Sequence, residues 1–445
     1  MTSRPLKRIL GAPTALLIGM GVAIGSGIFR TPGEVAGPLQ TPGLILLAWT
    51  LGGLVILAQS LVTAELATRF PQAGGEYVFL REAYGRFVAF FFGWAYTFCV
   101  IGAGAATIAA AFGDFSCGLF SVSPSRSGLF AAGAIVMVTG INAIGLRVGA
   151  AVQNVVTCLK IAALLGIVVI GFALGSRSLT SDPAPALIAS STPGLAIFLA
   201  ALLPVLWSYD GATDAVKLAE EVRDVRRNLP RAIIGGTIAL MVLYLAVNAA
   251  LMCVVAPSEM AGVSSVPGEA MGRLFGHNGR RAMLVVGMFA CLGCLSSTVL
   301  ATIRVTFALA RDGLTFRFMA HMSKSQAPVP ALLVVAAFAI FLVLNRSFSE
   351  VLRIYYFASA FLFGLSYASL IVFRLRESSF PSAVFRCPWG MVLAGLLILK
   401  ETAIASSIAY FSPRDAMYTA GLLASLGLLY FVWRRVVPDP PKDVS

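Results

Sequence analysis

Long apolar segments separated by short polar stretches run through the whole chain. Twelve of these segments are close to the roughly 20 residues that a helix needs to cross the hydrocarbon core of a bilayer. Their approximate bounds are 13–35, 42–68, 87–112, 127–146, 150–174, 193–216, 231–255, 282–309, 329–345, 350–373, 390–411 and 416–434. Because the connections are short, no sizeable soluble domain fits between them. We therefore predict an all-α polytopic membrane protein with 12 transmembrane helices.

The first and sixth apolar segments are interrupted near their middle. Gly25, Ser26 and Gly27 weaken the first, and Pro204 and Gly211 weaken the sixth. An unpaired backbone group in the hydrocarbon region costs several kcal/mol, so such a break persists only where it lines a cavity or holds a ligand. The two breaks are five spans apart, which is the offset of inverted repeats. Paired broken helices of this kind are the best pointer in a sequence to a transporter site.

This offset divides the chain into five parts. We predict a cytoplasmic N-terminal segment (1–12), a first inverted repeat of five helices (13–175), a second repeat (193–375), a further pair of helices (390–435) and a cytoplasmic tail (436–445). Lys and Arg are more abundant in the segments that this threading places inside the cell, which supports cytoplasmic termini. The strongest basic cluster follows the sixth span and consists of Lys217, Arg223, Arg226, Arg227 and Arg231.

Two connections are polar enough to carry short helices of their own. Between the second and third spans, the sequence FPQAGGEY at 70–77 leads into a helical pattern through Arg81, Glu82 and Tyr84. It predicts a cytoplasmic loop with a short interfacial helix. The stretch 257–281 predicts an external loop that also contains a short helix.

Composition supports the membrane class and excludes several kinds of chemistry. Of 445 residues, 58% are apolar and 12% are charged, and the net charge is +13. The basic residues are dispersed over loops, which fits retention on the inner side of a membrane better than nucleic-acid binding. The two histidines lie in predicted loops and no intramembrane carboxylate pair accompanies them, which argues against an intramembrane enzyme. Cys291 and Cys294 lack further ligands for a metal, so we expect no metal and no cofactor.

The helix ends at the two breaks suit a zwitterion. A half-helix that begins near Ser26 presents free N–H groups to a carboxylate, and the ends of the preceding half-helices present free carbonyls to an ammonium group. Two alternatives remain open at this point. Gly25 and Gly27 could only permit close helix packing, and Asp210 could either offer its carboxylate to an amine or cap the broken helix.

Lys160 is a cation near the middle of the fifth span. Burying it there costs roughly 2.5–3.5 kcal/mol, so a functional role is the default hypothesis. A partly desolvated lysine can give up its proton, or it can replace a bound cation by reaching the carbonyls of a broken helix. The alternative is a side chain that extends to the cytoplasmic surface.

Four motifs give the chain a resemblance to a known family. They are IGSGIF at 24–29, FPQAGGEY at 70–77, WSYDG at 207–211 and ARDGL at 310–314. In this order and spacing they resemble the amino acid–polyamine–organocation superfamily, and most of all its L-type amino-acid transporter branch and related bacterial permeases. The resemblance implies a LeuT-like five-plus-five inverted repeat with discontinuous helices 1 and 6 and two additional spans.

The resemblance also implies roles for particular residues. The substrate carboxylate would lie on backbone N–H groups of the first break, the α-amino group would meet backbone carbonyls of both breaks, and two aromatic residues of the sixth span would close over the substrate. Lys160 would take the place of a sodium ion and serve as the coupling residue. The candidate substrate-binding residues are Ala23, Gly25, Ser26, Gly27, Ile28, Trp207, Tyr209 and Asp210.

The chain departs from the family pattern in two places. Many relatives have an aromatic residue after the glycine of the sixth span, whereas this chain has Ala212, so occlusion would rely on Trp207 or on the eighth span. The eighth span offers small and hydroxylated residues at 295–298, which favours a small or medium neutral amino acid. Cys117 lies in the predicted external loop through which some relatives join an accessory subunit, but we expect no such partner.

Together these observations predict a secondary active amino-acid transporter of the cell membrane that works by alternating access. Transport would be sodium-independent, either as proton-coupled symport or as exchange, and the protein would not be an enzyme. The expected partners are the amino acid, protons and the lipid bilayer, without nucleic acid. The alternatives are a transporter-like sensor that binds without flux and an obligate exchanger without net uptake.

Overall fold

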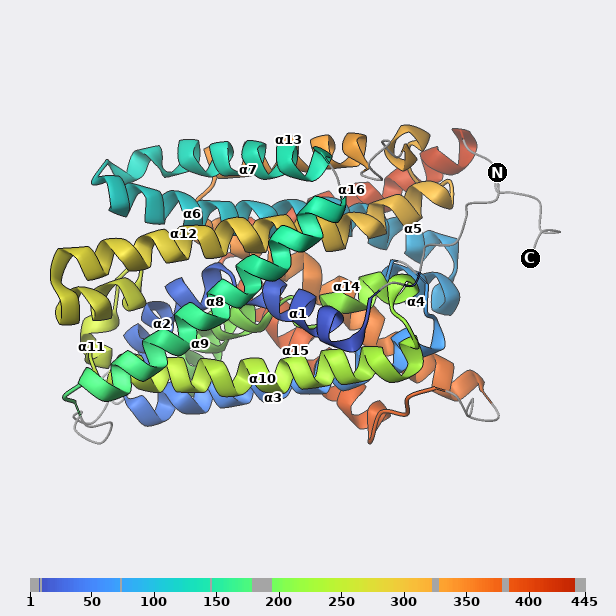
Figure 1. Ribbon diagram of the computed structural model, residues 1–445. Coiled ribbons are helices and arrows are strands. Elements are labelled where there is room, and N and C mark those ends of the chain that lie inside the picture. The colour runs from blue at the N-terminus through green and yellow to red at the C-terminus, as the bar shows by residue number, and fades with distance from the viewer. Residues whose placement is uncertain are drawn as a thin grey trace.

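The computed structural model describes residues 8, 10–72, 74–144, 146–177, 194–321, 328–377 and 384–436. These residues form a bundle of helices, most of which run along one common direction (Figure 1). Within them the only bridge between extended segments joins Leu10 and Val222. We call the end of the bundle that holds α4 (Glu76–Tyr84) the α4 end, and the opposite end, which holds α11 (Pro257–Met260), the α11 end.

The other helices follow the predicted apolar segments. They are α1 (Ala12–Ala23), α2 (Ser26–Leu39), α3 (Pro42–Arg69), α5 (Arg86–Ala95), α6 (Ala103–Phe120), α7 (Ser127–Ile144), α8 (Leu146–Leu174), α9 (Gly194–Tyr209), α10 (Val225–Met252), α12 (Val266–Arg311), α13 (Val329–Asn345), α14 (Phe348–Arg376), α15 (Gly390–Phe411) and α16 (Pro413–Val436). A π-helix, η1 (Tyr96–Gly102), joins α5 to α6, and a 3-10 helix, η4 (Asp214–Glu221), follows α9. The predicted all-helical class is therefore confirmed for the described residues.

Most of these helices are suited to a bilayer. In the described part of the chain, nine are long and apolar enough to cross a membrane, and the bent pair α1 and α2 adds a tenth span. The helices α9 and α13 have only 16 and 17 residues, so the count of twelve spans and the inverted repeat stay predictions. Apart from Val436 in the tail and a few residues of the N-terminal segment, the two predicted terminal segments lie outside the described residues.

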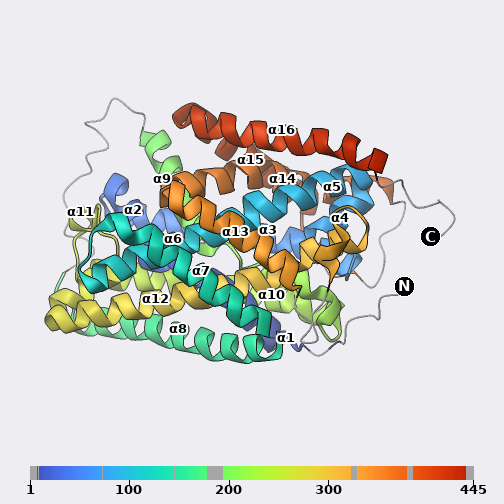
Figure 2. The same ribbon diagram turned by 90° about the horizontal axis from the view of Figure 1, so that it is seen from above.

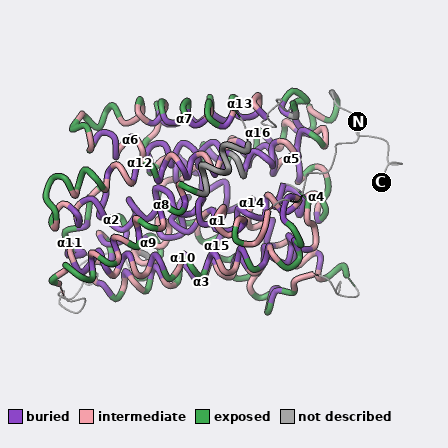
Figure 3. The backbone as a smooth tube through the Cα atoms, in the orientation of Figure 1, coloured by how far each residue is buried: buried purple, intermediate pink, exposed green. Residues whose placement is uncertain are grey.

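Exposed residues are frequent on the outer helices, whereas buried residues gather along the central helices (Figure 3). Many of the exposed residues are large and apolar. Helices α8 and α16 lie on opposite sides of the bundle (Figure 2). Leu159 and Val169 of α8 and Leu428 of α16 are all more than 60% exposed. A surface of this kind is unfavourable in water but matches the hydrocarbon of a membrane. The protein is accordingly an integral membrane protein.

Two of the predicted connections differ from their prediction. The helix at 76–84 exists, but Tyr77, Phe79 and Leu80 are buried, so α4 packs into the bundle instead of lying on its surface. The stretch 257–281 is mostly helical, because α11 and the first part of α12 occupy it and a sharp turn at Gly276 (φ 67°) interrupts α12. The prediction of a loop rested on the polarity of this stretch. Polarity alone does not distinguish a loop from a short helix at a membrane surface.

Two of the four sequence motifs meet at the α4 end. The Tyr77 hydroxyl donates a hydrogen bond of 2.7 Å to Asp312, and Arg81 forms an ion pair of 2.6 Å with the same carboxylate. A second ion pair of 2.9 Å joins Arg304 of α12 to Glu221 of η4. These contacts hold α4, α12 and η4 together on one side of the interrupted helices.

The two interrupted helices lie side by side in the centre of the bundle. A bend of 46° at Ile24 and Gly25 separates α1 from α2. After Tyr209, α9 gives way to a turn containing Gly211 (φ 92°), and the chain continues as η4. The half-helix α2 packs against α9, and α1 packs against η4. Both predicted interruptions are thus confirmed, and they face each other.

Candidate functional site

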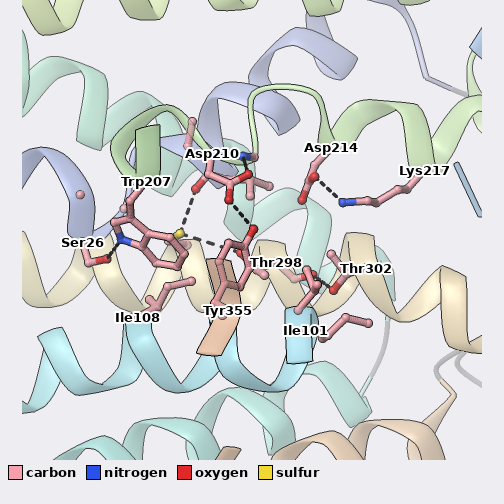
Figure 4. A pocket seen from close by; sticks show the side chains of 18 of the residues that line it. Ser26, Ile101, Ile108, Trp207, Asp210, Asp214, Lys217, Thr298, Thr302 and Tyr355 are labelled. Carbon is pink, nitrogen blue, oxygen red and sulfur yellow. Dashed lines mark hydrogen bonds and ion pairs between the residues drawn. The ribbon is translucent and has the colours of Figure 1, made fainter. Parts of the chain in front are cut away.

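A central cavity of about 50 Å³ lies between the two breaks (Figure 4). Since a single water molecule needs about 10–15 Å³ by this kind of measure, the cavity has room for a few waters or a small solute. Among the predicted site residues, those that line the cavity are Ala23, Gly25, Ser26, Gly27, Trp207 and Asp210. The structure therefore brings together most of the residues that the two breaks were expected to supply.

The first break presents the start of α2 to the cavity. Because α2 begins at Ser26, the N–H groups of Ser26, Gly27 and Ile28 belong to its first turn and have no acceptor within the helix. The positive end of the helix dipole points the same way and favours a carboxylate. Ile28 is fully buried and is not among the residues that line the cavity.

Close packing also accounts for the glycine at position 27. A Cβ atom on Gly27 would lie 2.6 Å from the Cα atom of Ser208 in α9. The two half-helices are joined at this point by a hydrogen bond of 2.6 Å between the hydroxyls of Thr31 and Ser208. Gly27 is therefore required for helix packing, whether or not its N–H group also holds a ligand.

The carbonyl groups at the end of α1 already have partners in the protein. Gly21 O accepts from Lys160 Nζ at 3.1 Å, Val22 O accepts from the Cys294 thiol at 2.9 Å, and Ala23 O accepts from the Tyr244 hydroxyl at 3.0 Å. A carbonyl oxygen has two lone pairs, so each can accept one more hydrogen bond. The break is consequently held open by side chains of α8, α12 and α10.

Lys160 supplies one of these partners and does not reach the surface. Its side chain lies on α8, only 3% of the residue is exposed, and its ammonium group donates to Gly21 O. The structure therefore contradicts the alternative in which this side chain extends to the membrane surface. Lys160 does not line the cavity, but it places a positive charge at the negative end of the α1 dipole.

Two residues of the second break close one side of the cavity. Trp207 Nε1 donates to the Ser26 hydroxyl at 3.3 Å, and the Trp207 ring meets the Tyr355 ring edge-to-face with centroids 5.2 Å apart. Asp210 Oδ1 accepts the Gly211 N–H at 2.8 Å, while Oδ2 accepts the Tyr355 hydroxyl (Figure 4). Asp210 thus caps the turn of the broken helix, which is one of the two roles that the sequence left open.

Tyr209 lies behind the cavity wall. It is fully buried, its hydroxyl donates to Trp49 O at 3.2 Å, and its ring packs against Trp49 and Tyr244. It is not among the residues that line the cavity. The aromatic residues that do line it are Trp207 and three that the sequence did not single out: Tyr96, Tyr355 and Phe363.

These omissions have physical reasons. Tyr96 is the first residue of the π-helix η1, an element that was not predicted from the sequence, and such helices are rare but frequent at functional sites. Tyr355 lies in α14, far from the two breaks in the sequence. A single tyrosine in an apolar span does not indicate which way its side chain points. Lys217 was assigned to a cytoplasmic basic cluster, yet it is buried, lines the cavity and pairs with Asp214.

Cys117 also lies elsewhere than predicted. It is in the last turn of α6 and not in a loop, because that helix continues as far as Phe120. The residue is buried, and its thiol is 3.5 Å from Ser123 O.

In the described part of the chain, no three His, Cys, Asp or Glu side chains are placed to hold a metal ion.

Comparison with known proteins identifies the family of the chain. The sequence model of the amino acid permease family matches residues 10–432. The b(0,+)-type amino acid transporter 1 of Mus musculus is 28% identical over 445 residues, which cover 98% of this chain and 91% of that protein. The serine/threonine exchanger SteT of Bacillus subtilis (strain 168) is 30% identical over 379 residues, which cover 83% of this chain and 84% of that protein. The chain therefore belongs to the amino acid permease family of the amino acid–polyamine–organocation superfamily.

Proposed function

We propose that this membrane protein is a sodium-independent secondary transporter that carries small to medium neutral amino acids by alternating access, as an exchanger or with protons. The observation that carries the proposal is the pair of facing helix breaks around a small central cavity. The N–H groups at the start of α2 would hold the substrate carboxylate, and the carbonyls of Ala23, Trp207 and Asp210 would hold the α-amino group.

The charges around the cavity support a neutral substrate. Asp210 is engaged by Tyr355 and by the Gly211 N–H, and Lys217 is paired with Asp214. Thr298 of α12 offers a hydroxyl to a polar side chain, and the cavity volume of about 50 Å³ favours a small one. The similarity to a serine/threonine exchanger points in the same direction.

Lys160 supports sodium independence. Its ammonium group is bound to Gly21 O beside the first break, where it would occupy the position that a sodium ion would otherwise take.

In this proposal the chain has twelve spans, with α9 and α13 completing the count, and the first ten form two inverted repeats. The α4 end faces the cytoplasm of a cell whose plasma membrane holds the protein.

A panel of radiolabelled amino acids tests the proposal in proteoliposomes of the purified chain. We expect counterflow of serine, threonine or alanine into vesicles loaded with the same amino acid, and rates that change by less than about twofold when choline replaces sodium. The absence of flux for every amino acid would overturn the proposal, and binding without flux in the same sample would favour a sensor. A steep rise with a sodium gradient would exclude the proposed role of Lys160.

The same assay tests whether a partner chain is needed. A buried Cys117 in the last turn of α6 is poorly placed for a disulfide bond to another protein. We therefore propose that the chain transports without an accessory subunit. Flux that appears only after a second polypeptide is added would contradict this.

Tyr355→Phe should change the selectivity of the cavity. Loss of the Tyr355 hydroxyl leaves Asp210 Oδ2 without its partner at the cavity wall, while Oδ1 keeps the Gly211 N–H. A hydrogen bond to a charged group contributes about 1.5–3 kcal/mol, so we expect serine counterflow to fall by about tenfold and the ratio of lysine to serine uptake to rise.

Tyr356→Phe is the matched control for this change. Tyr356 is the next residue of α14 and is also buried, but its hydroxyl has no hydrogen-bond partner in the described residues. This variant should keep the wild-type rate and selectivity. Identical profiles for the two variants would show that the Tyr355 hydroxyl does not control Asp210.

A further inference from the structure

A buried charge cluster lies on the side of the cavity toward the α4 end. Lys217 of η4 forms an ion pair with Asp214, and its ammonium group is 5.2 Å from the centre of the Tyr96 ring. Lys217 is 2% exposed and Asp214 is 8% exposed, and both line the cavity (Figure 4). The cavity is therefore bounded at this end by an ion pair that is almost completely shielded from solvent.

The two residues before Glu76, which is the first residue of α4, pack against Lys217. The Gly74 N–H donates to Lys217 O at 3.4 Å, and a Cβ atom on Gly75 would lie 3.1 Å from Lys217 Cγ. Gly75 has a φ of 52°, which glycine adopts without strain and which lets the chain enter α4 at this close approach. The start of α4 and the segment after the second break are thus held together.

One carboxylate oxygen of Glu76 is without a partner. Glu76 is 6% exposed, and its Oε2 atom makes no hydrogen bond to any described residue. With all three side chains ionised, Glu76, Asp214 and Lys217 carry a net charge of −1. A buried charge without compensation costs several kcal/mol, and the uptake of one proton removes it.

The groups that face Glu76 act in opposite directions. Burial raises the pKa of Glu76, and the negative charges of Asp214 and Asp210 raise it further, whereas Lys217 and the N–H at the start of α4 lower it. Two buried phenols, Tyr96 of η1 and Tyr367 of α14, also interact with it. Lys217 and the N–H at the start of α4 therefore stabilise the charged carboxylate of Glu76, whereas burial and the neighbouring carboxylates stabilise its neutral form.

We propose that Glu76 is a proton-binding site of this transporter, connected to the central cavity through the Asp214–Lys217 pair. In the binding step, Oε2 forms one O–H bond with a proton delivered by water from the cavity, and the net charge of the cluster rises from −1 to 0. In the release step, that bond breaks and the proton passes to water at the α4 end. The site is separate from Lys160, which lies on α8 against α1. The inference rests on the proposed transport function.

The test compares two modes of transport in the same proteoliposomes. The first is serine counterflow at equal pH on both sides, which needs no net proton movement. The second is net serine uptake into empty vesicles with an acidic exterior, with pyranine inside to report proton entry. Glu82→Gln is the matched control, because Glu82 is a half-exposed carboxylate on the same helix whose partner is Arg81.

We expect Glu76→Gln to keep counterflow within about threefold of wild type and to lose both the response to the proton gradient and the pyranine signal. Glu82→Gln should keep both modes. A gradient response that persists in Glu76→Gln would overturn the proposal, and so would a wild type that exchanges serine but ignores the gradient. If no wild-type counterflow of any amino acid occurs, the proposed function itself fails.

A second variant covers the case in which Glu76→Gln does not fold. Glu76→Asp keeps a titratable group on a shorter side chain, so gradient-driven uptake should remain with a shifted pH dependence. Loss of counterflow in both variants, with Glu82→Gln unaffected, would assign Glu76 a structural role and overturn the proposal.

Discussion

Gly27→Ala is expected to reduce amino-acid counterflow by about 100-fold. The new Cβ atom would lie 2.6 Å from the Cα atom of Ser208, and the other atoms near it belong to the Ser208 side chain. Backbone atoms cannot move aside as the end of a flexible side chain can, so α2 and α9 must separate by roughly 1 Å. A displacement of this size in a binding geometry can cost about 100-fold in rate.

Gly37→Ala is the matched control for this prediction. Gly37 lies on the same half-helix α2, and a Cβ atom there would make an ordinary contact of 3.5 Å with the Ala261 Cβ atom. The measurement is the initial rate of serine counterflow, normalised to the amount of monodisperse protein that is reconstituted. Equal rates for the two variants would show that the close approach of α2 and α9 is not needed for transport.

Lys160→Met is expected to lower counterflow by about 10-fold to 100-fold, because the ammonium group that binds Gly21 O is lost while the length of the side chain is nearly kept. A hydrogen bond to a charged group contributes about 1.5–3 kcal/mol, and each 1.4 kcal/mol corresponds to about tenfold. The end of α1 would also lose a cation that stabilises its dipole.

Leu159→Met provides the control for the lysine variant. Leu159 is the preceding residue of α8, but its side chain is 64% exposed on the outside of the bundle. Counterflow in this variant should match wild type in buffers with sodium and with choline. A wild-type counterflow rate in Lys160→Met would show that the hydrogen bond between its ammonium group and Gly21 O is not needed for substrate exchange.

The pattern of small and apolar residues predicted the helices and both interruptions. A break in a transmembrane helix depends largely on local chemistry, because glycine and proline weaken the interior of a helix. The interruptions at Gly25 and at Gly211 could therefore be located from the chain alone. The intramembrane position of Lys160 was equally visible, since a single cation within an apolar span is rare and costly.

The direction and the partners of side chains could not be read in the same way. Tyr209 and Tyr355 are both tyrosines in apolar spans, but one packs behind the wall against Trp49 and the other reaches Asp210. Lys217 belongs by sequence to a basic cluster, yet it is buried beside Asp214. For the two tyrosines the partner depends on which distant segment lies opposite, and the burial of Lys217 likewise depends on packing against Tyr96 of another helix.

The chain alone thus determined the membrane class, the positions of the two breaks and the cation at Lys160, because hydrophobicity, helix propensity and the cost of a buried charge are properties of short segments. Only the tertiary structure decided that Tyr355 caps Asp210 and that Glu76 faces Lys217. These pairs join residues of segments that are distant in the sequence, and their contacts arise from the packing of the whole bundle. The backbone breaks of the site therefore follow from short segments of sequence. Its side-chain contacts instead depend on how distant segments pack together.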